Sequence, residues 1–217
     1  MKKSSSSKQW LARHVNDPYV QRSKREGYRS RSAYKLAEID ERDKLLQPGM
    51  VLVDLGAAPG GWSQVAAKRL GRGGSVIAID LLPMDPVAGV TVLQGDFTRR
   101  AGLAAVETAL DGRRADAVLS DMAPNMSGIA VSDQARSMEL AEIARDFAVL
   151  HLKSEGVFVV KIFQGAGYDE YLRSLRAAFT KVAVRKPAAS RGESAEQYLV
   201  ARGPKALNSK LATPHVE

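Results

Sequence analysis

Short apolar runs alternate with amphipathic segments along most of the chain. Runs rich in Val, Ile and Leu predict buried strands at residues 50–55, 75–81, 90–93, 115–120 and 156–163. Helical spacing of apolar residues predicts helices at residues 30–46, 61–70, 99–110, 132–153 and 169–179, the first with Ser30 or Ser32 as its N-cap. This repeated alternation is typical of a mostly parallel sheet with helices on both faces.

Two further predicted strands, at residues 181–186 and 197–201, follow without room for a helix between them. Such a pair favours an antiparallel hairpin at one edge of the sheet. The sequence therefore predicts a single α/β domain at residues 30–203, built on a seven-stranded sheet. Residues 1–29 are expected to form a basic, partly flexible arm, and residues 204–217 a flexible tail.

Composition narrows the class of protein. The chain has 217 residues, of which 45% are apolar and none is cysteine. The lack of cysteine excludes disulfides, thiolate metal sites and a cysteine nucleophile. The scattered histidines His14, His151 and His215 do not indicate a metal site. No secretory signal and no apolar run long enough to span a membrane are recognisable, so a cytoplasmic monomer without metal is expected.

Positive charge is concentrated at the beginning of the chain. The formal net charge is +8, and residues 1–35 hold ten basic and two acidic residues, which gives the same +8. Cations neutralise phosphates and aromatic rings stack on unpaired bases, so this segment is a candidate RNA-binding arm. A solvated basic tail or attraction to an acidic membrane surface would give the same charge pattern. The interleaved tyrosines are Tyr19, Tyr28 and Tyr34. The candidate phosphate contacts are Arg29 and Arg31.

The strongest local signal is the segment VLVDLGAAPGGWSQ at residues 51–64. A predicted strand ends near Asp54, a glycine-rich turn follows, and a helix begins. Gly56, Gly60 and Gly61 allow the backbone to approach a ligand closely, and ligands of parallel sheets bind beyond the carboxyl ends of the strands. A tight turn without any ligand would give the same pattern, so the turn alone does not decide.

Two acidic residues stand at the carboxyl ends of the next predicted strands. Asp80, in VIAID, can accept hydrogen bonds from ribose hydroxyls, and Asp96, in VLQGD, can accept one from an adenine amino group. With the glycine turn they indicate a pocket for an adenosine-containing cofactor. The turn reads G-x-x-x-G-G and lacks the G-x-G-x-x-G spacing of dinucleotide sites. S-adenosylmethionine, which has no phosphate, fits this turn better, with Trp62 either lining the pocket or packing on the sheet.

Five segments together, DLGAAPGGWSQ, IDLLPMDP, QGDF, SDMAPNMSG and VVKIFQG, resemble the FtsJ/RrmJ family of ribosomal RNA ribose 2′-O-methyltransferases. The resemblance covers residues 28–203. It implies a class I methyltransferase (Rossmann-like) fold and S-adenosylmethionine as the cofactor. It also implies that the substrate is a ribose 2′-hydroxyl in large-subunit ribosomal RNA, a uridine of 23S RNA in the assembled subunit.

The resemblance also assigns site residues. Its catalytic Lys–Asp–Lys–Glu tetrad corresponds to Lys35, Asp121, Lys161 and Glu196, where Glu196 matches better than the nearby Glu193. The cofactor residues that it implies are Gly60, Trp62, Asp80, Asp96 and Asp121, and the glycine-rich turn adds Gly56 as a candidate.

Independently of the family, Lys161 is unusual because it interrupts an apolar strand, where lysine is seldom buried without a partner. A lysine that extends from the strand end to water would explain this pattern equally well. The functional hypothesis is that Lys161 takes the hydroxyl proton or stabilises the developing alkoxide, and that Asp121 fixes its position. Lys35 and Glu196 would then place the ribose.

Other functions fit the sequence less well. Base amino-methyltransferases commonly carry an aromatic residue after the fourth strand, but this chain has DMAPNM there. A nicotinamide-dependent oxidoreductase is opposed by the glycine spacing. An RNA-binding ribosome assembly factor that has lost activity would keep the fold, although the complete tetrad argues against it.

Overall fold

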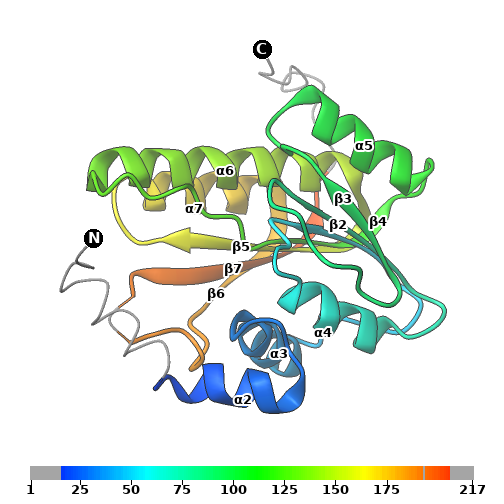
Figure 1. Cartoon of the computed structure of the whole chain (residues 1–217). Coiled ribbons are helices and arrows are strands. Elements are labelled where there is room, and N and C mark those ends of the chain that lie inside the picture. Colours follow the sequence, from blue (N-terminus) through cyan, green and yellow to red (C-terminus); the bar gives the residue numbers. More distant parts are fainter. Residues whose placement is uncertain (1–15, 193, 206–217) are drawn as a thin grey trace.

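The computed structural model describes residues 16–192 and 194–205, in which helices cover both faces of a central sheet (Figure 1). The strands are β1 (Val51–Leu55), β2 (Ser75–Asp80), β3 (Val90–Gln94), β4 (Ala115–Ser120), β5 (Leu152–Phe163), β6 (Phe179–Arg185) and β7 (Glu196–Pro204). The helices are α2 (Pro18–Glu26), α3 (Ser32–Asp43), α4 (Gly61–Leu70), α5 (Arg100–Leu110), α6 (Ala130–His151) and α7 (Tyr168–Ala178).

The sheet is mixed, and its strand order is β3-β2-β1-β4-β5-β7-β6. Strands β1 to β5 pair in parallel, whereas β7 lies antiparallel between β5 and β6. The predicted α/β class, the seven strands and the antiparallel edge hairpin are confirmed. The strand order reverses direction between β1 and β4, and open parallel sheets bind their ligands beyond the strand ends at such a point.

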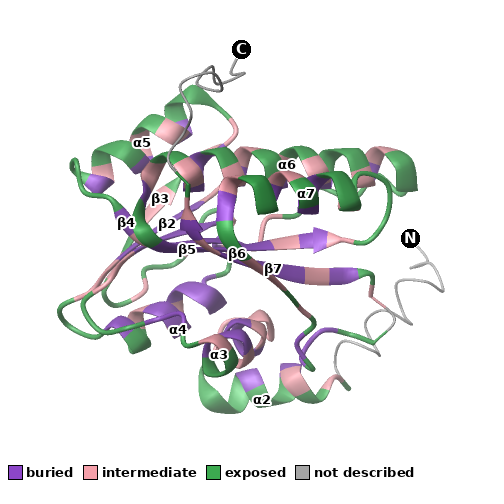
Figure 2. Cartoon of the chain, turned by 180° about the vertical axis from the view of Figure 1, so that it is seen from behind, coloured by how far each residue is buried: buried purple, intermediate pink, exposed green. Residues whose placement is uncertain are grey.

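Each face of the sheet packs against its own apolar cluster. Helices α5, α6 and α7 bury Val106, Phe147 and Leu175 on one face. Helices α3 and α4 bury Leu36 and Trp62 on the other. Figure 2 shows the buried positions gathered on the strands and on the sheet-facing sides of these helices. Full burial of one such side chain contributes roughly 1.5–3 kcal/mol, so the strand ends that carry the candidate site are held by a large core.

Helix α2 is the main difference from the expected architecture, because the sequence predicts a partly flexible arm there. The Asp17 carboxylate caps the helix by accepting hydrogen bonds from the backbone N–H groups of Tyr19 and Val20. Gly27, in the left-handed conformation, ends it. Residues 1–15 of the predicted arm, Glu193, and the predicted tail beyond residue 205 lie outside the described residues.

The boundaries of α3 also differ from those predicted. The hydroxyls of Ser30 and Ser32 hydrogen-bond to each other at 2.6 Å, and Arg31 occupies the N-cap without a side-chain cap bond. At the other end Lys44 adopts a left-handed conformation. The Asp40 carboxylate then accepts the next two backbone N–H groups. The helix is therefore shorter at both ends than residues 30–46.

Helix α6 and strand β5 meet earlier than the apolar pattern predicts. The helix ends at His151, before the expected residue 153, and β5 begins at Leu152, before the expected residue 156. Leu152 pairs with Ala115 of β4, and a register shift follows before the regular pairing resumes. This early pairing explains why the strand begins inside the predicted helix. Within the described residues, none of the helices has the length and apolar character that a membrane crossing requires.

Candidate active site

The glycine-rich turn after β1 lies tightly against neighbouring loops. Gly56 and Gly60 have φ angles of 75° and 108°, which favour glycine. A Cβ atom on Gly56 would lie 2.6 Å from the Cγ atom of Met122, in the loop after β4. The backbone N–H of Gly56 donates to the Ile79 carbonyl of β2 at 2.9 Å. Only a residue without a side chain fits at Gly56, so the turn forms a close-fitting backbone cradle at the strand ends.

Asp80 ends β2 and Asp96 follows β3, and local hydrogen bonds hold both carboxylates. The two Asp80 oxygens accept N–H groups from Ala58 and Leu82 at 2.9 and 2.8 Å. One Asp96 oxygen accepts the N–H and the hydroxyl of Thr98 at 2.9 and 2.6 Å. Both side chains remain partly exposed. Because a carboxylate has about four lone-pair sites, each retains acceptor capacity for a ribose hydroxyl or an amino group.

Trp62 is placed differently from the other candidate cofactor residues, because its side chain belongs to the core. It is only 2% exposed, and its ring centroid lies 5.6 Å from that of Tyr198. Its indole N–H donates to the Ser32 carbonyl at 2.9 Å. The side chain thus packs on the sheet and joins α4 to α3, which leaves the Trp62 backbone as the part available to a cofactor.

Lys161 and Asp121 form a close ion pair on adjacent strands. Asp121 directly follows β4, whose last residue pairs with Val160 of β5. The Lys161 Nζ lies 3.0 Å from the Asp121 Oδ1, and it donates to the Asp121 backbone carbonyl at 2.6 Å. The Lys161 side chain is 8% exposed. The sheet therefore presents an ammonium group with a fixed partner, as the hypothesis for this pair requires.

Lys35 and Glu196 form a second ion pair, between α3 and the start of β7. The Lys35 Nζ lies 2.6 and 2.8 Å from the two carboxylate oxygens of Glu196. The Ser190 hydroxyl donates to the same carboxylate at 2.9 Å. Burial raises the pKa of Glu196. This effect is outweighed by the charge and hydrogen bond of Lys35, the hydrogen bond of Ser190 and the charge of Lys161, so the net pKa lies below its usual range. Glu196 is therefore held as an anion.

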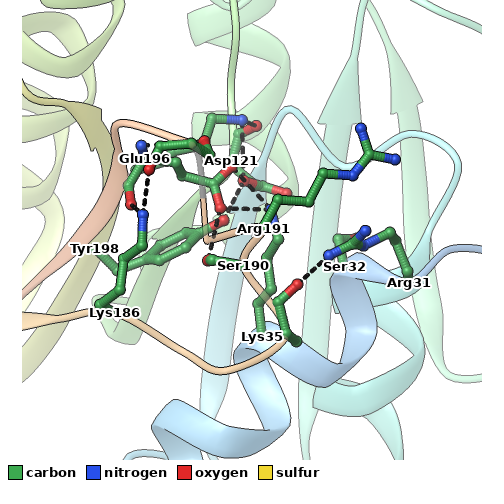
Figure 3. Close-up of polar contacts among 12 residues, drawn as sticks. Arg31, Ser32, Lys35, Asp121, Lys186, Ser190, Arg191, Glu196 and Tyr198 are labelled. Atoms are coloured by element: carbon green, nitrogen blue, oxygen red, sulfur yellow. Dashed lines mark hydrogen bonds and ion pairs between the residues drawn. The ribbon is translucent and has the colours of Figure 1, made fainter. Parts of the chain in front are cut away.

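Tyr198 connects the Lys161–Asp121 and Lys35–Glu196 pairs, although it is not among the site residues that the sequence predicts. Its hydroxyl donates to the Asp121 Oδ1 at 3.0 Å, and the Lys35 Nζ lies 5.7 Å from its ring centroid. Burial, the Asp121 and Glu196 charges and its hydrogen bonds raise the Tyr198 pKa well above the usual value, so the hydroxyl keeps its proton. Figure 3 shows Lys35, Asp121, Glu196 and Tyr198 converging.

Strand alternation explains this convergence and supplies the signal for Tyr198. Tyr198 lies two residues after Glu196, so both side chains point to the same face of β7. In the antiparallel register, Lys161 faces Tyr198 and Phe163 faces Glu196. The four tetrad residues predicted from the resemblance therefore meet on one side of the sheet, next to the glycine turn.

A buried carboxyl group lies in β1, directly before the glycine-rich turn. Asp54, the fourth residue of β1, is fully buried, and its Oδ2 accepts the Ser63 hydroxyl at 2.6 Å. Among the described residues, its Oδ1 has no hydrogen-bond partner. Burial raises the pKa of Asp54 to about 7, with smaller contributions from the charges of Asp121 and Asp80, while the Ser63 hydrogen bond opposes them. The group thus ionises near neutral pH.

The candidate RNA contacts of the N-terminal segment are only partly available. Tyr34 is 5% exposed, and the rings of Tyr19 and Tyr28 each lie 5.6 Å from it. Arg29 donates to backbone carbonyls, and Arg31 contacts the Asp17 carboxylate and the Ala189 carbonyl. The expectation that these tyrosines stack on bases is therefore wrong for Tyr34, because its ring is committed to internal packing.

A surface hollow of about 740 Å³ lies near the N-terminal segment, and Tyr28, Gln64 and Lys68 are among its lining residues. It includes neither the tetrad nor the carboxylates at the strand ends. Arg29 and Pro86 also line the hollow, so it adjoins the loops after β1 and β2 without containing the candidate active site, which we place by its chemistry at the carboxyl ends of β1, β2 and β4.

Comparison with known proteins connects this geometry to a family. Residues 28–204 match the model of the FtsJ-like methyltransferases. Proteins named ribosomal RNA large subunit methyltransferase E are similar over almost their whole length. The relative from Azoarcus sp. is 59% identical over 92% of this chain and 98% of its own, and the one from Thiobacillus denitrificans is 54% identical over 98% and 96%.

Solved structures show the same architecture. A protein from Plasmodium falciparum, named as a ribosomal RNA methyltransferase, superposes with a TM-score of 0.73 at 29% identity, over 82% of this chain and 98% of its own. A methyltransferase from Streptococcus mutans in complex with SAH superposes with a TM-score of 0.51 at 9% identity, over 78% and 97%. The second likeness concerns the fold alone. Because the family model covers most of the described residues and the relatives exceed half identity, the chain belongs to the FtsJ-like methyltransferase family.

Proposed function

We propose that this protein transfers a methyl group from S-adenosylmethionine to a ribose 2′-hydroxyl of large-subunit ribosomal RNA. We take the target to be a uridine of 23S RNA in the assembled subunit, and the compartment to be the cytoplasm. The observation that carries the proposal is the pair of ammonium–carboxylate contacts, Lys161–Asp121 and Lys35–Glu196, beside the glycine cradle. The names of the relatives support ribosomal RNA as the substrate class.

The residues at the strand ends fit the cofactor. The Gly56 cradle excludes side chains, and Asp80 and Asp96 keep free acceptor capacity beside it. We assign the cofactor to Gly56, Gly60, the Trp62 backbone, Asp80, Asp96 and Asp121. When bound, S-adenosylmethionine supplies a methyl group attached to a positively charged sulfur.

In this proposal Lys161 assists the loss of the proton from the ribose hydroxyl. The oxygen that receives a methyl group must lose its proton, and a positioned side chain typically contributes a factor of about 10²–10⁴ to such a transfer. As a neutral amine, the Lys161 Nζ takes the hydroxyl proton and becomes an ammonium; as an ammonium, it instead stabilises the developing alkoxide while the proton passes to water. The Asp121 carboxylate and carbonyl, at 3.0 and 2.6 Å, hold the ammonium group in one place.

The second pair positions the ribose. Lys35 is held by both oxygens of Glu196, and the short distances leave it little freedom. Tyr198 donates to Asp121 and lies beneath Lys35, so it aligns the two pairs. Alignment of this kind matters because an in-line transfer requires the reacting atoms to be held close to their final geometry.

The RNA reaches the site, in this proposal, along the N-terminal segment. The last turn of α2 carries Lys24 and Arg25, which are exposed and lie close in sequence to helix α3. These cations suit the phosphate backbone of RNA, whose contacts provide affinity without sequence preference. The 2′-hydroxyl itself distinguishes RNA from DNA.

The test is a methylation reaction with purified protein, S-adenosylmethionine and large ribosomal subunits from cells that lack the enzyme, followed by mass analysis of the nucleosides. A ribose-methylated uridine is expected, and it should be absent with Lys161→Ala. A methylated base would favour a base amino-methyltransferase and contradict the proposal. No methylation, with RNA binding retained, would favour an inactive assembly factor and also contradict it.

A further inference from the structure

Arg29 occupies an unusual position for a residue in a basic segment. Its guanidinium group donates to three backbone carbonyls: Pro59 at 3.3 Å, Asp85 at 2.6 Å and Pro86 at 2.7 Å. A guanidinium has five N–H donors in a rigid fork, and here the fork spans two separate loops. These contacts could not be inferred from the sequence, because the acceptors are main-chain atoms 30 to 57 residues away.

The two loops are walls of the cofactor site. Pro59 belongs to the glycine-rich turn after β1, whereas Asp85 and Pro86 belong to the loop that follows Asp80 at the end of β2. A Cβ atom on Gly60 would lie 3.0 Å from the Arg29 Nη1 and 3.0 Å from the Met84 sulfur. Arg29 therefore lies where both walls come together, in contact with the glycine turn itself.

The backbone of Arg29 is anchored as firmly as its side chain. The Gln64 amide oxygen accepts the Arg29 N–H at 2.8 Å, and the Gln64 amide nitrogen donates to the Gly27 carbonyl at 3.0 Å. Gln64 lies in the first turn of α4, directly after the glycine turn. The arginine is thus held from one wall of the site while its side chain reaches the other.

We propose that Arg29 is a positioning residue that clamps the glycine turn to the loop after β2 and so sets the shape of the cofactor pocket. This inference rests on the proposed function, because it assumes that the pocket binds S-adenosylmethionine. It differs from the expectation drawn from charge, in which Arg29 contacts an RNA phosphate. Three of the five donors of Arg29 are engaged with carbonyls, so its removal affects the cofactor more than the RNA.

Calorimetry of the RNA-free protein with S-adenosylmethionine tests this role, using Arg29→Ala, Arg29→Lys and the control Arg25→Ala. Arg25 is an exposed cation in the same segment. Arg29→Ala should weaken cofactor binding about tenfold, since hydrogen bonds from a charged donor to several acceptors are lost. Arg29→Lys should weaken it less, because lysine keeps the charge without the fork. Arg25→Ala should leave it unchanged.

Steady-state kinetics separate positioning from general damage. Arg29→Ala should raise the KM for S-adenosylmethionine while kcat at saturating cofactor, the KM for RNA and the salt dependence of RNA binding stay unchanged. An unchanged cofactor affinity, together with a salt slope reduced by about one, would overturn the inference and make Arg29 a phosphate contact. If the unaltered protein does not bind S-adenosylmethionine, the proposed function and this inference both fail.

Discussion

The two ammonium–carboxylate pairs of the site are alike in chemistry but differ in how the fold builds them. Lys161 and Asp121 come from adjacent parallel strands in the middle of the sheet, where backbone pairing and the core fix both residues. Lys35 and Glu196 come from a helix near the beginning of the chain and a strand near its end. The Lys161–Asp121 pair is therefore fixed by the sheet itself, whereas the Lys35–Glu196 pair depends on how helix α3 packs against the rest of the fold.

Polar side-chain contacts help to dock α3. The Glu38 carboxylate accepts the backbone N–H groups of Ala188 and Ala189, in the loop between β6 and β7 that also carries Ser190. Asp43 forms a two-point ion pair with Arg185 of β6, at 2.5 and 2.7 Å. The N-terminal helices thus arrange the loop around Glu196, while the sheet arranges Lys161.

In the proposed mechanism, this difference corresponds to a division of labour between the two pairs. A group that handles a proton needs the most rigid support, which neighbouring strands of a buried sheet provide. A group that positions a large substrate can stand on an element that also contacts that substrate. The predictions below either break one pair while keeping the other, or alter the link between them.

The largest effect is expected from Lys161→Ala. Turnover at saturating cofactor and RNA should fall by about 10²–10⁴, since a positioned proton acceptor is lost, whereas S-adenosylmethionine affinity should be retained because Asp80 and Asp96 remain. Single-turnover methyl transfer measures the first and calorimetry the second. The matched control is Lys153→Ala, an exposed lysine at the start of the same strand. Near-normal turnover would remove Lys161 from the mechanism.

A smaller loss of activity, with a loss of stability, is expected from Lys35→Ala. The Glu196 carboxylate would stay buried without its main partner, which should lower the free energy of unfolding by about 2 kcal/mol near neutral pH. The KM for RNA should rise more than kcat falls. Urea denaturation and steady-state kinetics check both quantities.

The double variant Lys35→Ala/Glu196→Gln sharpens that comparison because it removes the unpaired charge. It should recover part of the lost stability without recovering activity. If Lys35→Ala alone left the unfolding free energy unchanged, the ion pair would not contribute to the docking of α3.

Tyr198→Phe tests the link between the pairs. The ring keeps its packing against Trp62, but Asp121 loses one hydrogen-bond donor. Because a hydrogen bond to a charged group contributes about 1.5 kcal/mol or more to stability, the free energy of unfolding should fall by about that amount, and kcat should fall about tenfold because Asp121 is no longer aligned by Tyr198. Tyr168→Phe, which removes another partly buried hydroxyl outside the tetrad, serves as the control. Unchanged kcat in Tyr198→Phe would mean that Asp121 does not need this donor.

The smallest effect concerns Asp54 and appears in the pH dependence of stability. Its folded-state pKa of about 7 lies above the ordinary value of about 3.9. Between these values the folded protein holds the extra proton, so this group's contribution to stability is present at low pH and is lost as the pH rises through 7. The slope should approach about 1 kcal/mol per pH unit.

Asp54→Asn removes this titration, so urea denaturation from pH 5 to 8 should give a flatter profile for the variant than for the unaltered protein. An equal slope in both proteins would show that Asp54 ionises normally despite its burial.

The sequence predicts where the sheet places several of the candidate site residues. The alternation of strands and helices predicted the sheet, and Asp80, Asp96 and Lys161 stand at strand ends or in a strand where local pattern and family resemblance both placed them. These positions depend on short segments whose neighbours are fixed by the sheet topology. Lys35 and Glu196 were assigned from the resemblance, and the structure brings them together although they lie far apart in sequence.

The features that the sequence does not predict are those that depend on contacts between distant segments of the chain. Helix α2 has few apolar residues, and its buried members are Val20 and Ser23, so periodicity gave little signal for it. Arg29 finds its partners among main-chain carbonyls, which no residue pattern reveals. The sequence does not single out Tyr198, because an aromatic residue in a strand usually packs in the core. Here the side chain is buried and its hydroxyl also donates to Asp121.

The pH dependence of single-turnover methyl transfer tests the division of labour most directly. Lys35→Ala should lower the rate but keep the shape of the profile of the unaltered protein, because the proton is still handled by Lys161. Lys161→Ala should change that shape, with a rate that rises steadily toward alkaline pH as solvent hydroxide replaces the missing group. The opposite assignment, an altered profile in Lys35→Ala and a preserved one in Lys161→Ala, would contradict the account.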